Sequence, residues 1–253
     1  MENMQDIFIG DEGRGSPLVL VHGFLGSTEM WDPQIKYFKE NFRVLSPALP
    51  GFGKSNNLQS CDSIECMAQT ILKVLEKKQI KKFNLLGHSM GGMIVQEMTK
   101  LAGNKVEKLI CYGTGPRGNM PERFETIDQS RERLKTEGLI NTAHRIAKTW
   151  FVKEDKADHF DLCLKAGKLT SLKAADAALE AMKNWSGLEN LKNIKNKTLI
   201  IWGDKDRAYN RNQVDTLNEN IIDSNLIIFE GCSHNVHLEN PQKFNKTVSD
   251  FLQ

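Results

Sequence analysis

Residues 83–92 read FNLLGHSMGG and decide the fold of this chain. Three of the first four are apolar, which predicts a buried strand, and apolar residues recur at helical spacing afterwards: Met93, Ile94, Met98 and Leu101. Glycines on both sides of Ser89 remove Cβ atoms where a strand and a helix crowd together. Ser89 is then held in a strained backbone conformation with its hydroxyl projecting above the sheet, as in a nucleophile elbow. The alternative is a glycine-rich turn that contains an ordinary serine.

Strands and helices alternate on both sides of this stretch. A continuous apolar run at Leu18–Val21 is typical of a strand buried on both faces of a parallel sheet. Residues 43–45 open another strand, residues 106–112 form a further one, and a short edge strand is expected at 7–9. Amphipathic helical patterns separate the strands. The alternation predicts an α/β fold with a mostly parallel sheet flanked by helices.

The pattern changes after Gly113. No strand is legible again until Thr198–Trp202, and the last strand is expected at 226–229. Between residues 113 and 198, four helical patterns are predicted, at 121–137, 141–152, 156–168 and 171–183. We therefore divide the chain into a core of residues 1–115 and 195–253 and a helical cap of residues 116–194. The cap is expected over the carboxyl edge of the sheet.

Composition limits the classes of function. Hydrophobic residues make up 40% and charged residues 26% of the 253 positions, as in ordinary globular proteins. A formal net charge of +2 is too balanced to indicate a nucleic-acid partner. No apolar run approaches the roughly 18 residues of a membrane span, and residues 1–16 lack the apolar core of a signal peptide. We expect a soluble, cytoplasmic protein whose partners are small molecules, without nucleic acid or membrane.

The cysteines indicate neither a metal site nor a disulfide framework. Their number is odd and their spacing lacks the paired pattern of metal ligands: Cys61, Cys66, Cys111, Cys163 and Cys232. Cys61 and Cys66 form one close pair, but no second pair follows them. Reduced thiols are the expectation.

Two later loops supply partners for Ser89. A serine hydroxyl needs a base, and the base needs an orienting acid, in the chain order Ser, Asp or Glu, His. The strand at 198–202 leads to Asp206, and the last strand leads to His234. Both loops leave the same edge of the sheet as the elbow, so Ser89, Asp206 and His234 form a candidate triad. Asp204, which can fold back on its own turn, is the rival acid, and His237 is the rival base.

Acyl transfer also needs donors for a developing oxyanion. The backbone N–H of Met90, at the start of the predicted elbow helix, is one candidate. The second is the backbone N–H of Phe24, in the loop after His22-Gly23. In the alternative reading, that loop only turns the chain.

With these residues identified, the chain resembles a known family along nearly its whole length. Five segments carry the resemblance: HGFLGS (22–27) followed by Trp31, LPGFGKS (49–55), GHSMGG (87–92), WGDKD (202–206) and SHNVHLENP (233–241). Together they are similar to α/β-hydrolases of the small esterase/lactonase branch, and the cap is similar in layout to 3-oxoadipate enol-lactonase and its relatives. The resemblance implies an α/β-hydrolase fold with a helical cap inserted after the sixth strand of the common fold. It also implies the triad and both oxyanion donors named above.

Two features depart from the family pattern. Ala48 stands where the family often has an acidic residue before the LPG turn, which weakens a bracing interaction of that loop. The region before Leu18 is also short, so the first strands of the common fold are expected to be truncated or missing.

The leading hypothesis is a serine hydrolase that cleaves a carboxylic ester or lactone through an acyl-enzyme on Ser89, without cofactor or metal. HGFLGS followed by Trp also resembles the pyruvate-eliminating enzyme of menaquinone biosynthesis, whose anionic substrate needs cations. The cap offers four arginines for that purpose, although exposed, solubilising arginines are the commoner case: Arg117, Arg123, Arg131 and Arg145. Carbon–carbon bond hydrolases of the same fold are a third possibility. A receptor-like homologue that only binds its ligand is the alternative outside enzymes.

Aromatic residues are the candidates for lining a substrate pocket. We expect Trp31, Trp150, Phe151 and Trp185 in this lining, and Phe124 and Phe160 also lie in the cap. Helix amphipathicity accounts for several of them equally well as filling between cap and core. The oligomeric state is not readable from the sequence.

Overall fold

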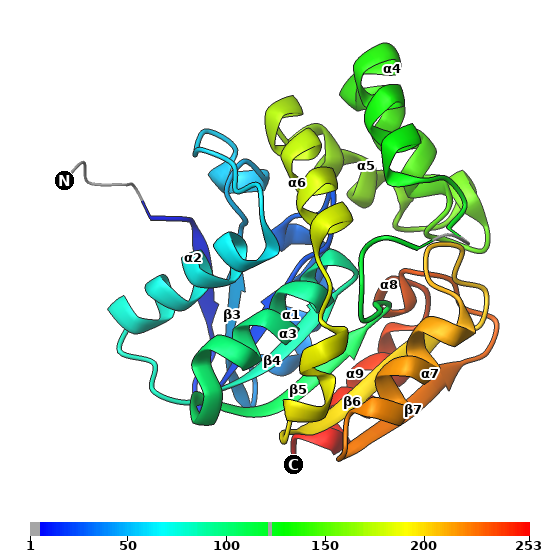
Figure 1. Cartoon of the computed structure of the whole chain (residues 1–253). Coiled ribbons are helices and arrows are strands. Elements are labelled where there is room, and N and C mark those ends of the chain that lie inside the picture. Colours follow the sequence, from blue (N-terminus) through cyan, green and yellow to red (C-terminus); the bar gives the residue numbers. More distant parts are fainter. Residues whose placement is uncertain (1–5, 121–122) are drawn as a thin grey trace.

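The computed structural model describes residues 6–120 and 123–253 and contains a mixed, mostly parallel sheet (Figure 1). The seven strands are ordered β1-β3-β2-β4-β5-β6-β7, and only β1 runs antiparallel to its neighbour. Their bounds are β1 (Ile9–Glu12), β2 (Ser16–Val21), β3 (Phe42–Pro47), β4 (Phe83–His88), β5 (Val106–Tyr112), β6 (Lys197–Gly203) and β7 (Ser224–Phe229). The predicted fold class is confirmed, with the edge strand beginning two residues later than expected.

Helices cover both faces of this sheet (Figure 1). One face carries α2 (Ile64–Lys77), α3 (Met90–Ala102) and α7 (Arg211–Asn220), and the other carries α1 (Asp32–Phe38) and α9 (Pro241–Leu252). Strand β4 is buried throughout and β2, β5 and β6 are buried along most of their length, and their side chains alternate between two apolar clusters. Leu85 belongs to the cluster under α3, whereas Leu86 belongs to the cluster under α9. This alternation explains the continuous apolar runs in the sequence.

The inserted helices lie together beyond the carboxyl edge of the sheet (Figure 1). They are α4 (Ile127–Lys148), α5 (Phe160–Lys168) and α6 (Leu172–Asn184). Two predicted helices form the single element α4, interrupted at Gly138, whose φ of 77° is not helical. The predicted start at 121 falls on residues 121–122, which lie outside the described residues. A capping box at Thr126 and Gln129 begins α4 instead.

Backbone hydrogen bonds close the base of the insertion. Gly118 N–H donates to the carbonyl of Trp185, and Gly187 N–H donates to the carbonyl of Pro116. The insertion follows β5, the fifth strand of the described residues. The sequence had placed it after the sixth strand of the common fold, whose first strands were expected to be truncated or missing. The boundaries 116 and 194 remain a proposed division of the chain.

The elbow is a tight junction between β4 and α3. Ser89 has φ 56° and ψ −120°, a strained conformation for a residue with a side chain. The backbone of α3 passes so close to β2 that a Cβ at Gly91 would lie 2.2 Å from the carbonyl oxygen of Val21. Ser89 N–H donates to the carbonyl of Tyr112 at 2.9 Å. The junction therefore depends on a glycine at position 91 and is held by neighbouring strands on both sides.

One expectation from the sequence is wrong. Cys61 and Cys66, expected as free thiols, form a disulfide in the structure. Helix α2 begins between them at Ile64, so the chain turns back and their Cα atoms lie 5.7 Å apart, within the range of a disulfide. The other three cysteines are buried free thiols: Cys111, Cys163 and Cys232.

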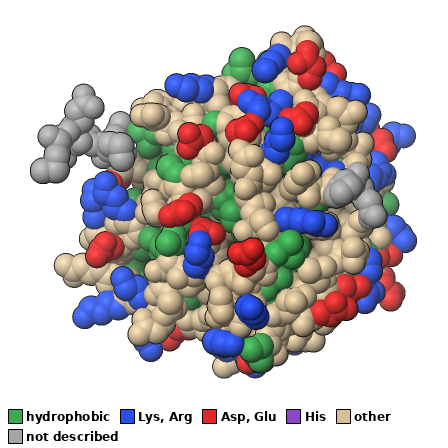
Figure 2. All heavy atoms as spheres, viewed as in Figure 1, with side chains coloured by type: hydrophobic (Ala, Val, Ile, Leu, Met, Phe, Trp, Pro, Cys, Tyr) green, Lys and Arg blue, Asp and Glu red, His purple; other side chains and the backbone are tan. Residues whose placement is uncertain are grey.

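The surface matches the balanced charge of the sequence. On the face drawn in Figure 2, lysine and arginine side chains are interspersed with aspartate and glutamate. Within the described residues, no helix has the length and apolarity needed to cross a membrane.

Gly91→Ala is expected to destabilise the protein more than Gly103→Ala. The new methyl group at position 91 meets the carbonyl of Val21, whereas a Cβ at position 103 meets nothing within 4 Å and is penalised only by φ of 54°. Overpacking of this kind costs up to about 3 kcal/mol, so we expect the melting temperature of Gly91→Ala to fall by roughly 5–10 °C. Thermal unfolding followed by circular dichroism measures both variants. Equal losses would contradict the close approach of α3 to β2.

Candidate active site

The parallel register brings four loops to one edge of the sheet. Val21 pairs with Gly87, His88 with Tyr112, and Gly203 with Phe229, so the carboxyl ends of these strands are level. The loops that follow these strands carry the candidate residues of the site: Phe24, Ser89, Asp206 and His234. The predicted convergence of these loops is thus present in the fold.

Asp206 and His234 form a buried pair. His234 Nδ1 lies 2.8 Å from Asp206 Oδ2, and the two side chains are 2% and 0% exposed. The other carboxylate oxygen accepts hydrogen bonds from the backbone N–H groups of Ala208 at 2.7 Å and Tyr209 at 3.1 Å. Asp206 is therefore fixed by its own loop. An ionised Asp206 makes Nδ1 the protonated nitrogen and leaves Nε2 as the acceptor.

The rival acid has other partners. Asp204 accepts a hydrogen bond from Gly231 N–H at 2.6 Å and pairs with Lys205 at 2.8 Å. The Lys205 contact lowers the pKa of Asp204. Asp204 therefore links its loop to the loop that carries His234, rather than folding back on its own turn. The structure brings Asp206, and not Asp204, to the histidine.

The rival base lies behind His234. His237 Nδ1 is 2.9 Å from the Tyr112 hydroxyl, which donates to the carbonyl of His234 at 2.8 Å. The ring of Trp31 packs against His237 with centroids 4.8 Å apart. His237 thus supports the loop of His234 from beneath, as the sequence suggested. Trp31, expected in the pocket, is part of this buried layer instead.

Two further histidines in this layer make structural hydrogen bonds. His22 Nε2 accepts from Leu49 N–H at 3.1 Å, and His88 Nε2 lies 3.2 Å from the carbonyl of His234. Burial lowers the pKa of His22 to about 4 and that of His237 to about 3. Burial also lowers the pKa of His88 well below its usual value. All three rings are therefore neutral at pH 7.

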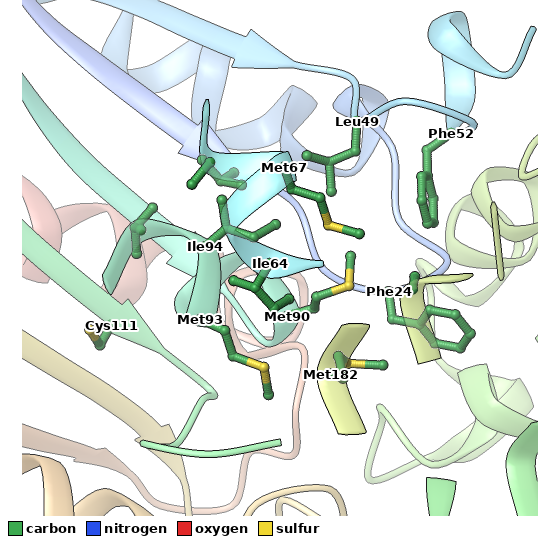
Figure 3. Close-up of a cluster of buried hydrophobic side chains, with 14 of the residues drawn as sticks. Phe24, Leu49, Phe52, Ile64, Met67, Met90, Met93, Ile94, Cys111 and Met182 are labelled. Atoms are coloured by element: carbon green, nitrogen blue, oxygen red, sulfur yellow. The ribbon is translucent and has the colours of Figure 1, made fainter. Parts of the chain in front are cut away.

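Ser89 and His234 open onto one narrow cavity between core and cap. Its walls are mainly apolar, and the other lining residues are Phe24, Met93, Gly118, Met120, Arg123, Phe124, Ile146, Trp150, Met182, Ala208 and Tyr209. Figure 3 shows Phe24, Met93 and Met182 close together, with Met182 supplied by the cap helix α6. Both parts of the chain therefore shape this cavity.

Not all of the aromatic residues that were expected to line the pocket lie on this cavity. Trp150 lies on the cavity, with its ring centroid 6.3 Å from that of His234. Phe151 is buried on the other side of this segment and contacts a different pocket, near His159. Trp185 donates its indole N–H to Glu97 at 3.2 Å, on the flank of α3. Helix amphipathicity predicted that these residues are buried. The direction of the chain after α4 and after α6 determines which neighbours each of them contacts.

The loop after β2 reaches the elbow. A Cβ at Gly23 would lie 2.9 Å from the Cβ of Ser89, so the backbone of this loop passes directly over the serine. Phe24 follows Gly23 and lines the cavity, while Met90 is the first residue of α3. The two backbone N–H groups expected as oxyanion donors therefore belong to the segments on either side of Ser89.

Tyr209 is a site residue that the sequence analysis missed. Its ring stacks on that of His234, with centroids 5.7 Å apart and an angle of 11° between the planes. Burial raises its pKa to about 12, and hydrogen bonding with the side chains of Ser89 and Thr114 opposes that rise. The hydroxyl thus stays protonated beside Ser89. Its only signal in the sequence is its position three residues after Asp206.

The cap segment that follows α4 is tied to the loop that carries His234. Asn235 N–H donates to the carbonyl of Trp150 at 3.0 Å. Glu239 accepts hydrogen bonds from Val152 N–H at 2.7 Å and from Ser233 N–H at 2.5 Å. These bonds fix residues 150–152 of the cap relative to His234.

Comparison with known proteins places this geometry in context. A family model described as alpha/beta hydrolase fold matches residues 16–241. A 2-hydroxy-6-oxononadienedioate/2-hydroxy-6-oxononatrienedioate hydrolase of Escherichia coli is 29% identical, over 97% of this chain and 90% of that protein. An esterase from Exiguobacterium antarcticum has a TM-score of 0.88 at 25% identity, covering 98% of this chain and 96% of its own. The enol-lactonase from Burkholderia xenovorans LB400 has a TM-score of 0.88 at 22% identity, covering 97% and 96%.

The neutral histidines predict a loss of stability in mild acid. In the unfolded chain a histidine takes up a proton near pH 6.5, but His22 and His237 resist protonation down to about pH 4 and 3. The unfolded state therefore binds more protons below pH 6.5, and the free energy of unfolding falls as the pH falls. His22 and His237 each contribute a loss of roughly 2 kcal/mol between pH 7 and 5.

Urea unfolding at pH 7 and pH 5 measures this loss. His237→Phe removes one of the three groups and is expected to lose about a third less stability over that interval. His144→Gln, at an exposed position, is the matched control and leaves the pH dependence unchanged. A stability that is flat between pH 7 and 5 would show that these rings are protonated in the folded protein.

Proposed function

Because this chain belongs to the alpha/beta hydrolase fold family, we propose that it is a serine hydrolase of small carboxylic esters or lactones. Ser89 is the nucleophile, His234 the general base and Asp206 the orienting acid. The observation that carries the proposal is the buried 2.8 Å contact between Asp206 and His234, on the same cavity as the strained Ser89. A histidine fixed by an acid, close to a serine in a strained turn, is the arrangement that activates a hydroxyl for acyl transfer.

The reaction proceeds in two halves. His234 Nε2 takes the proton of the Ser89 hydroxyl while the oxygen attacks the substrate carbonyl carbon, and the imidazolium then protonates the departing alkoxide. The acyl group remains on Ser89 as an ester. His234 next deprotonates a water molecule that attacks this ester, and the proton returns to the serine oxygen as the acid leaves. Asp206 stabilises the imidazolium in both halves.

The backbone donors complete the proposed site. The N–H groups of Phe24 and Met90 stabilise the negative charge that develops on the carbonyl oxygen. The N–H of Met90 also lies at the N-terminus of α3, where the helix dipole favours an anion. This chemistry uses only groups of the chain and requires no metal or cofactor.

The comparisons support acyl-transfer chemistry at this level. The esterase from Exiguobacterium antarcticum shares the fold over nearly the whole chain. The relative from Escherichia coli, named for its dioate substrates, favours a second candidate, hydrolysis of a carbon–carbon bond by the same triad. The elimination alternative has less support, because Arg123 is the only one of the four cap arginines among the residues that line the described cavity.

The first test is hydrolysis of p-nitrophenyl esters from acetate to octanoate. We expect turnover by the wild type, and Ser89→Ala and His234→Ala each to lose about as much activity as the double variant, because triad members act as a unit. The initial rate of p-nitrophenolate release measures all three. Additive losses would argue against this triad, and no turnover by a folded wild type would favour the carbon–carbon hydrolase candidate.

A second test separates the two aspartates. Asp206→Asn is expected to lower kcat roughly ten-thousandfold, because an amide holds the histidine in the wrong tautomer. Asp204→Asn is the matched control, two residues earlier in the same loop. This variant is expected to keep most of its activity, because the partners of Asp204 are Gly231 and Lys205. The reverse order of effects would transfer the role of acid to Asp204.

A further inference from the structure

Arg123 is a cation with no ion-pair partner among the described residues of the cavity. It lines the cavity together with Ser89 and His234. Within the part of the chain that the structure describes, its Nε atom is buried and has no hydrogen-bond partner. The Phe124 ring, with its centroid 5.2 Å from the guanidinium carbon, is its aromatic neighbour. A ring face compensates little of what the buried Nε loses by leaving water.

Two carboxylates that the structure describes near this cavity, Glu125 and Asp206, have other hydrogen-bond partners. Glu125, two residues away, accepts two hydrogen bonds from Arg145, at 2.7 and 2.8 Å, and another from Ser130 at 2.5 Å. Asp206 is occupied by His234 and by its own loop. Within the described residues, neither acid forms a hydrogen bond or an ion pair with Arg123, although the charge of Glu125 raises its pKa and opposes the effect of burial.

The other cap arginines show the contrast. Arg131 pairs with Asp176 and Glu180, and Arg145 pairs with Glu125 and Glu137. Arg117 is exposed to solvent. These three are balanced by carboxylates or by water, whereas the Nε of Arg123 faces neither. Burial lowers the pKa of Arg123, but an arginine remains charged at neutral pH.

We propose that Arg123 binds a carboxylate group of the substrate, so that the natural substrate is an ester or lactone that also carries a free carboxylate. This inference rests on the proposed function, because it places the scissile carbonyl at Ser89. The planar guanidinium offers the forked donors that a carboxylate accepts. The cavity is narrow and Arg123 is the only Lys or Arg among its described lining residues, which suits a single negative charge better than a phosphate.

Tyr209 extends the polar side of the cavity toward Ser89. The charge of Arg123 acts on the Tyr209 hydroxyl, and both side chains line the same cavity. With its pKa near 12, this hydroxyl is a neutral donor and does not compete for the guanidinium. The substrate carboxylate is therefore attracted to the polar part of the lining, whereas Phe24, Met93 and Met182 supply apolar surface to the same cavity.

Paired esters test this assignment. Hydrolysis of monomethyl succinate and monomethyl glutarate is compared with that of methyl butyrate and methyl pentanoate, by titration of the released acid at constant pH. The quantity of interest is the ratio of kcat/KM for a carboxylate ester to that for its neutral counterpart. We expect Arg123→Gln to lower this ratio about ten- to hundredfold, the usual effect of losing a hydrogen bond to a charged group. Arg117→Gln, the exposed control, leaves the ratio unchanged.

A binding measurement makes the assignment independent of turnover. Isothermal titration calorimetry compares glutarate binding to the wild type and to Arg123→Gln. Loss of binding in the variant supports a carboxylate site at Arg123, even if no ester is hydrolysed and the proposed function fails. Equal binding, or an unchanged ratio between the paired esters, overturns it even if Ser89-dependent esterase activity is found.

Thermal unfolding separates binding from a structural role. Removal of an unpaired buried charge is not expected to destabilise the protein, so Arg123→Gln keeps or raises the melting temperature. A lower melting temperature together with equal losses on charged and neutral esters would show that Arg123 only supports the fold.

Discussion

The close approach of the elbow to β2 is the constraint on which the rest of the site depends. The backbone at Gly91 passes so close to Val21 that no side chain fits there, and Gly23 lies over Ser89 in the same way. These two contacts place Ser89, the start of α3 and the loop of Phe24 within one small volume. A strained serine at such a junction has no freedom to relax, because Tyr112 and Thr114 hold its backbone N–H and carbonyl from the neighbouring strand and the loop that follows it. The site is thus assembled by backbone packing before any catalytic side chain contributes.

Two segments of the cap contribute to this site in different ways. Its segment after α4 is joined to the His234 loop through Trp150, Val152 and Glu239, so this part of the cavity wall is connected directly to His234. Another part of the wall is formed by residues that precede α4, among them Met120, Arg123 and Phe124, the last of which reaches solvent. Substitutions in the first segment are expected to affect the position of the base, whereas those in the second act on what the cavity admits. The cap therefore combines a supporting element and a selecting element in one insertion.

The sequence predicts those parts of the structure that depend on local pattern. Buried strands, the elbow and the order of the candidate residues all follow from short stretches whose chemistry permits few alternatives, such as the serine between two glycines. Properties that depend on how distant elements meet were not predictable in the same way. Trp31 is buried as its apolar character requires, but its contact with His237 depends on the last helices of the chain. Cys61 and Cys66 meet only because α2 begins between them, and Tyr209 gains its position from the loop that fixes Asp206.

The groups around His234 include both neutral rings and a cation. Behind His234, burial keeps His22, His88 and His237 neutral, so these three rings add no positive charge that would oppose the protonation of His234. Arg123 lines the cavity as well, and the described residues supply no hydrogen-bond partner for its Nε. A bound carboxylate would neutralise that guanidinium and would add a negative charge near the imidazolium that forms in the transition state. The same substrate group that satisfies Arg123 would then also favour proton uptake by His234, which couples recognition of the substrate to the chemistry at Ser89.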